Sequence, residues 1–138
     1  MSAYARRGGA LIYFAAAASV IATGLLLRLV PVGLPAFVVK YGGSVLWAAM
    51  VYFLLAGLLR DRRRLTVALI ACVVAGAVEL SRLWHFPALD AFRLTRAGIL
   101  LLGRVFSLWH FAIYWATIVV TAAADRAIVR GRDISIAP

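Results

Sequence analysis

Four long apolar segments constrain this chain more than any other feature. They extend over about residues 9–30, 43–59, 65–84 and 99–124, and the second could begin as early as Phe37. The hydrocarbon core of a bilayer is about 30 Å thick and needs about 20 apolar residues in a helix to cross it. We therefore predict an all-α integral membrane protein, built as a bundle of four transmembrane helices.

The composition supports a membrane protein and excludes several soluble classes. Hydrophobic residues make up 65% of the chain and charged residues 14%, against about 45–50% and about 25% in soluble domains. A length of 138 residues leaves room for a single transmembrane domain, residues 1–138, ending in a tail over residues 125–138. The net charge of +10 would suggest nucleic acid as a partner of a soluble protein, but we expect none here.

The basic residues predict an orientation. Most of them fall before the first span, between the second and third, and after the fourth, which are places that four spans bring to one side. Cytoplasmic loops of membrane proteins are rich in Lys and Arg. We therefore predict that both termini and the tail are cytoplasmic, in a multi-pass protein of the cell inner membrane. The residues on that side are Arg6, Arg7, Arg60, Arg62, Arg63, Arg64, Arg126, Arg130 and Arg132.

A polar segment interrupts the apolar pattern after the third span. Pro87 breaks the helix there, and charged residues recur until the fourth span begins. We predict that residues 86–97 form a short interfacial or re-entrant element that closes the outer end of the bundle.

Charged residues near this segment should converge at the outer end. Glu79 lies 14 residues after Leu65, which is about 21 Å along a helix, and Arg82 is on the same face at i, i+3. The ionic groups could neutralise one another and hold the helices together, or line an outward-facing cleft for an anionic or zwitterionic headgroup. The predicted cluster consists of Arg28, Glu79, Arg82, Asp90, Arg93 and Arg104.

His110 is a separate candidate within the fourth apolar segment. It lies on a stripe with Ser107 and Tyr114, at a spacing that points one helix face toward neighbouring helices. It could form a hydrogen bond between helices, or act as an axial ligand of a porphyrin-type pigment. We predict no metal site, because His85 is too distant in sequence and Cys72 is the single cysteine. Whether a pigment or lipid is bound stays open.

Three phrases of the sequence resemble one family of small bacterial membrane proteins. They are YGGSVLWAAMVYFLLA from Tyr41, VELSRLW from Val78 and LDAFRLTRAGILLLGRVF from Leu89. The chain is similar in these to the family called domain of unknown function 2809, over about residues 24–115. The resemblance implies four spans and no assigned activity. The pattern of Arg93, Thr95, Gly98 and Gly103 is also distantly similar to VanZ-like teicoplanin-resistance proteins.

The chain departs from the pattern of that family at three polar positions. The resemblance implies acidic residues at or near Ser44 and His110, and glutamine where this chain has Arg82. Any activity of the family that depends on those acids is therefore in doubt here.

Two functional hypotheses follow. The sequence contains no Gly-rich phosphate loop, no HExxH, no CxxC and no paired aspartates. The first hypothesis is therefore a non-catalytic accessory subunit that packs against other integral membrane proteins in a larger complex. The alternative is a protein that binds or transports an envelope lipid or its headgroup at the outer polar cleft. An enzyme of lipid or cell-envelope chemistry is a third hypothesis.

Overall fold

The helices account for most of the chain. The structure, a computed structural model, describes residues 3–31, 33–102 and 106–135, with side chains from residue 9 to residue 130 of these. Within these ranges there are helices and no strands, which confirms the prediction of an all-α fold. The helices are α1 (Ala3–Leu29), α2 (Ala36–Leu58), α3 (Arg64–Ser81), α4 (Pro87–Leu94), α5 (Arg96–Leu101) and α6 (Leu108–Ser135).

Four of these helices are long and apolar enough to cross a membrane. The candidate spans are Gly9–Leu29, Ala36–Leu58, Arg64–Ser81 and Leu108–Arg130, which agrees with the predicted number.

The bounds of two spans differ from the predicted ones. Helix α2 begins at Ala36, one residue before the earliest predicted start, and its N-cap Pro35 accepts a hydrogen bond from the N–H of Val39 (3.3 Å). The fourth span begins at Leu108 rather than near Ile99, since residues 96–101 form the separate helix α5. Helix α6 continues to Ser135, so much of the predicted tail is helical. Alanine and arginine after residue 121 favour this continuation.

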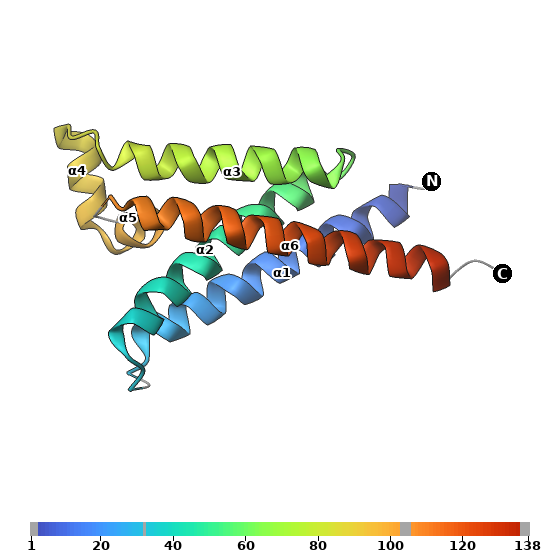
Figure 1. The fold of residues 1–138 in the computed structure, drawn as a ribbon, viewed down its shortest axis with the longest axis horizontal. Helices are drawn as coiled ribbons and strands as arrows, with labels where there is room; N and C mark the ends of the chain where they lie inside the picture. The colour runs from blue at the N-terminus through green and yellow to red at the C-terminus, as the bar shows by residue number, and fades with distance from the viewer. Residues whose placement is uncertain (1–2, 32, 103–105, 136–138) are drawn as a thin grey trace.

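The spans form two pairs that cross at an angle (Figure 1). Helices α3 and α6 lie side by side, and the hairpin of α1 and α2 crosses them, with α2 in contact with both. The start of α1, the α2–α3 connection and the end of α6 lie at one end, here called the loop end. Helices α4 and α5 lie at the opposite end, here called the α4–α5 end (Figure 1). The distribution of arginines predicts that the loop end faces the cytoplasm, and this orientation stays a prediction.

Small side chains fill much of the core between α2, α3 and α6. Ala48, Ala56, Ala71 and Ala75 are completely buried, and small residues let helices approach closely in a membrane. Helix α1 contributes little to this core and keeps most of its surface exposed, where acyl chains would cover it. The core consists of Ala48, Val51, Tyr52, Ala56, Val67, Ala68, Ala71, Ala75, Tyr114 and Ile118.

The segment after the third span folds as two short helices, neither long enough to cross a membrane. Pro87 occupies the first position of α4, where its missing N–H costs nothing. The side chain of Thr95 caps α5 by accepting a hydrogen bond from the N–H of Gly98 (3.0 Å). Gly98 packs so tightly that a Cβ there would lie 1.9 Å from the carbonyl oxygen of Phe92. The turn between α4 and α5 therefore requires glycine.

Candidate functional site

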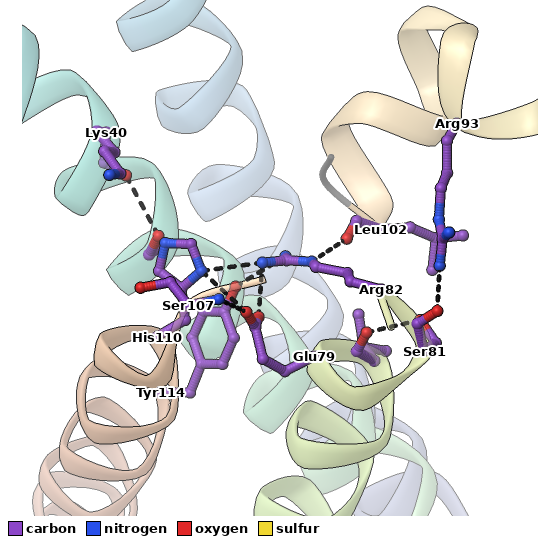
Figure 2. A network of polar contacts seen from close by, with 11 residues as sticks. Lys40, Glu79, Ser81, Arg82, Arg93, Leu102, Ser107, His110 and Tyr114 are labelled. Atoms are coloured by element: carbon purple, nitrogen blue, oxygen red, sulfur yellow. Dashed lines mark hydrogen bonds and ion pairs between the residues drawn. The ribbon is translucent and has the colours of Figure 1, made fainter. Parts of the chain in front are cut away.

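Glu79 is the centre of a polar cluster at the α4–α5 end (Figure 2). The residue is completely buried, and its Oε2 lies 2.6 Å from Nη1 of Arg82. Its Oε1 accepts a hydrogen bond from the backbone N–H of Ser107 (2.8 Å) and lies 3.2 Å from Nδ1 of His110. Both oxygens therefore have polar partners, as a carboxylate removed from water requires.

Arg82 connects the end of α3 to the start of α6. Its Nε donates to the carbonyl oxygen of Leu102 (2.5 Å), and its Nη2 donates to the hydroxyl of Tyr114 (3.2 Å). Its Nη1 lies 2.9 Å from Nδ1 of His110. A guanidinium group is always a donor, so this contact favours the His110 tautomer whose Nδ1 accepts.

The surroundings of His110 bear on its predicted role as a ligand. The residue is buried on α6, and its ring stacks on that of Tyr114 with centroids 5.7 Å apart. Its Nδ1 lies close to Nη1 of Arg82 and to Oε1 of Glu79. With Nδ1 as the acceptor, the hydrogen bond is the one that Arg82 donates from the end of α3, which agrees with the first interpretation. The charged guanidinium beside Nδ1 would repel a metal cation there.

Arg93 and Asp90 pair with each other and join α4 to the segment that follows α3. Arg93 is 5% exposed, and its Nη1 donates to the carbonyl oxygen of Trp84 (2.8 Å) and to Oδ1 of Asp90 (3.2 Å). Its Nη2 donates to the carbonyl oxygen of Ser81. Ser81 is the last residue of α3, where helices leave acceptors without partners, and Trp84 lies in the turn that follows. Arg93 therefore fastens α4 to α3, and Asp90, which also faces His85 (3.3 Å), supports it.

Arg28 lies on the other side of the cluster, at the end of α1. A Cβ on Gly43 of α2 would come within 3.1 Å of its Nη2. Gly43 therefore leaves the space that the guanidinium group occupies against α2. The remaining predicted residue, Arg104, lies outside the described residues.

A cavity of about 610 Å³ opens between α1, α2, α5 and α6. Among the described residues, its lining contains three cations and no carboxylate, and Glu79, the partner of Arg82, is not part of it. We call it the cationic cavity. Its polar lining consists of Arg28, Lys40, Ser44, Arg82, His110 and Tyr114, and its other lining residues are Ala36, Val39, Gly43, Trp47, Ile99, Leu100 and Leu101.

Two of the three cations lack an acidic partner. Neither Arg28 nor Lys40 forms an ion pair within the part of the chain that the structure describes. Lys40 lies over the ring of Tyr41, with its Nζ 5.3 Å from the centroid. The cavity therefore carries an uncompensated positive charge, which attracts anions.

Lys40 was not among the predicted site residues, although a signal for it exists. It lies four residues before Ser44, so both share one face of α2. The hydroxyl of Ser44 donates to the carbonyl oxygen of Lys40 (3.2 Å), and both residues line the cavity. The spacing of Lys40 and Ser44 on α2 could thus have predicted Lys40 as a site residue.

An apolar groove of about 300 Å³ adjoins the cationic cavity. The two share Arg28, Gly43, Trp47, Leu100 and Leu101 in their linings. The other residues that line the apolar groove are Val20, Ile21, Gly24, Leu25, Leu46, Met50 and Ala97.

The sequence pattern of a family described as "Protein of unknown function (DUF2809)" matches residues 33–118. The chain belongs to the DUF2809 family. This match confirms the resemblance found in the sequence, and it extends over α2 to α5 and the first part of α6. No curated protein and no solved structure matches the chain.

Most of the cationic cavity lies within the DUF2809 match. Lys40, Arg82 and His110 fall inside the matched range, whereas Arg28 precedes it. Ser44, Arg82 and His110, the positions at which the sequence predicted a departure from the family pattern, all line the cavity.

Proposed function

We propose that this DUF2809 protein binds the anionic headgroup of an envelope lipid in the cationic cavity. The observation that carries the proposal is the lining itself, in which Arg28, Lys40 and Arg82 border one space and no carboxylate is found among the lining residues that the structure describes. A phosphate or carboxylate group would supply the missing counter-charge. Arginine suits this role because its planar fork matches both groups in a bidentate manner.

The distribution of charge around the cavity favours binding of an anionic ligand over a role in which the charged groups only pair with one another. Glu79 neutralises Arg82 at 2.6 Å, so this pair adds little net charge. Arg28 and Lys40 remain, and both are exposed to an incoming ligand. Attraction between an anion and these cations is stronger beside the low-dielectric bilayer than in water.

The accessory-subunit hypothesis receives less support from the geometry. It predicts a surface for partner helices, yet the exposed apolar side chains of the spans, such as Leu69 and Val119, are equally suited to acyl chains. It also gives no role to a cavity lined by unpaired cations. We therefore rank headgroup binding first. From the distribution of arginines we place the cavity on the outer side of the inner membrane.

Lipid retention by charge-matched variants tests the proposal. The protein would be placed in phosphatidylcholine nanodiscs with a few per cent phosphatidic acid, and bound lipid would be measured by native mass spectrometry. Diacylglycerol, which lacks the phosphate, serves as the uncharged probe. We expect the wild type to retain phosphatidic acid preferentially, and Arg28→Gln with Lys40→Gln to weaken that retention about tenfold or more, because two charge-assisted contacts are lost.

The control is Arg62→Gln with Arg63→Gln, in the exposed loop at the opposite end. It changes the net charge equally, so it should leave the preference for phosphatidic acid unchanged. Equal loss of retention in both double variants would show non-specific attraction and refute the proposal, as would equal retention of diacylglycerol and phosphatidic acid.

A further inference from the structure

The cationic cavity and the apolar groove together have the polarity of an amphiphile. Building on the proposed function, we propose that the ligand is a lipid that places its anionic headgroup in the cationic cavity and one chain in the apolar groove. The protein would then take a single lipid molecule out of the bulk bilayer, and would not bind a water-soluble anion.

The shared wall carries the first step of this argument. Arg28, Gly43 and Trp47 from α1 and α2, and Leu100 and Leu101 from α5, line both spaces. A headgroup beside Arg28 is therefore next to the entrance of the groove. A free phosphate would fill only the cationic side, whereas a lipid accounts for both.

The shape of the groove suits a chain. Its floor includes Gly24, where even a Cβ would meet nothing closer than Leu46 at 3.9 Å, so the missing side chain leaves open space. Ile21 is 41% exposed and Leu101 is 47% exposed, which leaves the rim open to the surrounding bilayer. A volume of about 300 Å³ is near the lower end for ligand sites, about 300–1,000 Å³, and fits one chain segment.

Trp47 provides an independent observation at the junction. Its indole Nε1 is buried and has no hydrogen-bond acceptor among the residues that the structure describes, although buried indole N–H groups usually find one. The ring packs on that of Tyr114, with centroids 5.0 Å apart. A lipid with its headgroup on one side and its chain on the other would bring ester or phosphate oxygens to this residue.

Helix α5 forms one wall of the apolar groove and is attached to the bundle through α4. Its close backbone contacts are with α4, and Arg93 fastens α4 to the end of α3. Leu100 and Leu101 are therefore held over the groove by α4, without tight packing of α5 against α1 and α2. This leaves space between α5 and the α1–α2 hairpin for a chain to occupy.

Photolabelling tests where the chain lies. Phosphatidic acid with a diazirine at the end of one chain would be incorporated in nanodiscs with the wild type, and the labelled residues would be mapped by mass spectrometry. We expect labels concentrated on residues 20–25, 46–50 and 97–101. Gly24→Leu, which fills the groove, should reduce these labels about tenfold because a packed side chain excludes the chain.

Three further variants keep this test decisive. Ala18→Leu adds a similar side chain to an exposed position of α1 outside the groove, so it should leave the labels unchanged. Ala97→Leu fills the groove from exposed α5 and repeats the test if Gly24→Leu disturbs the packing of α1. Trp47→Phe removes the indole N–H together with the five-membered ring, and should weaken lipid retention about fivefold.

The outcomes separate this inference from the proposed function. Labels spread evenly over the four spans, with phosphatidic acid still retained through Arg28 and Lys40, would overturn the groove and leave headgroup binding intact. Labels unaffected by both Gly24→Leu and Ala97→Leu would also overturn it. If the wild type shows no preference for phosphatidic acid over diacylglycerol, both proposals are refuted.

Discussion

The two ends of the bundle each bury a carboxylate beside an arginine and a tyrosine, yet they differ in what surrounds it. At the loop end, Asp125 of α6 accepts hydrogen bonds from Tyr13 (2.6 Å) and Tyr52 (2.8 Å) and pairs with Nε of Arg64 (3.3 Å). This cluster joins all four spans. At the α4–α5 end, Glu79 and Arg82 form a comparable pair that contacts His110 and Tyr114.

The difference lies in the walls of the space beside each carboxylate. Asp125 has hydroxyl partners from two spans, and its cluster contributes contacts to the core, where Tyr52 is completely buried. The nearby depression of about 430 Å³ is lined by Arg64, Arg126, Val129 and Arg130, so it has almost no apolar wall. The cationic cavity instead combines unpaired cations with aromatic and aliphatic walls. At the loop end the contacts of Asp125 join the helices, whereas cations beside a cavity with apolar walls support the proposed amphipathic ligand.

The largest effect that could break this comparison is expected from Glu79→Ala. The substitution leaves Arg82, which is 8% exposed, without its carboxylate, and removing one partner of a buried ion pair costs about 3–5 kcal/mol. Unfolding in mixed micelles, followed by circular dichroism, measures the loss. Addition of Arg82→Met should restore part of the stability, because the isolated charge is then gone. A loss below about 1 kcal/mol would contradict a structural role for the pair.

Asp125→Asn should have a smaller effect on stability and none on the ligand. The side chain of Arg64 is 23% exposed, so water can solvate it when the charge of Asp125 is removed, and the amide oxygen still accepts one hydrogen bond. We expect a loss of about 1.5–3 kcal/mol and unchanged retention of phosphatidic acid. If retention fell together with stability, the two ends would not be functionally separate.

The smallest effects should come from single hydroxyl groups. Tyr52→Phe removes a hydrogen bond of 2.8 Å to a carboxylate, and we expect it to cost about 1–2 kcal/mol. Tyr114→Phe removes a longer contact of 3.2 Å to Arg82, and should cost about 0.5–1 kcal/mol. The same unfolding assay compares them, and the reverse order would show that Tyr114 is the more important structural anchor.

Much of the fold could be predicted from the sequence because apolar length decides it. The four spans and the break at Pro87 follow from hydrophobicity and backbone chemistry that each segment carries alone. The start of the fourth span at Leu108 could not be predicted in this way. Residues 99–102 are as apolar as a span, and only the turn at Gly98 and the packing of α5 against α4 remove them from it.

The candidate site was predicted in part. The spacing of Glu79 and Arg82 on one helix face led directly to their contact. Arg93 carries the same charge but binds backbone carbonyls of Ser81 and Trp84, and no sequence pattern distinguishes such a partner from a carboxylate. His110 was predicted as a separate candidate, although its Nδ1 lies 3.2 Å from Glu79.

The sequence by itself determined that this chain is a four-span helical membrane protein with ionic groups near one end, because hydrophobicity and helical spacing are local properties. Only the tertiary structure decided that Glu79 stands behind Arg82 while Arg28 and Lys40 face an open cavity. That decision depends on how α1 and α2 cross α3 and α6. Whether a charged group finds a partner depends on the distances between helices, and the sequence of a single segment does not determine these distances.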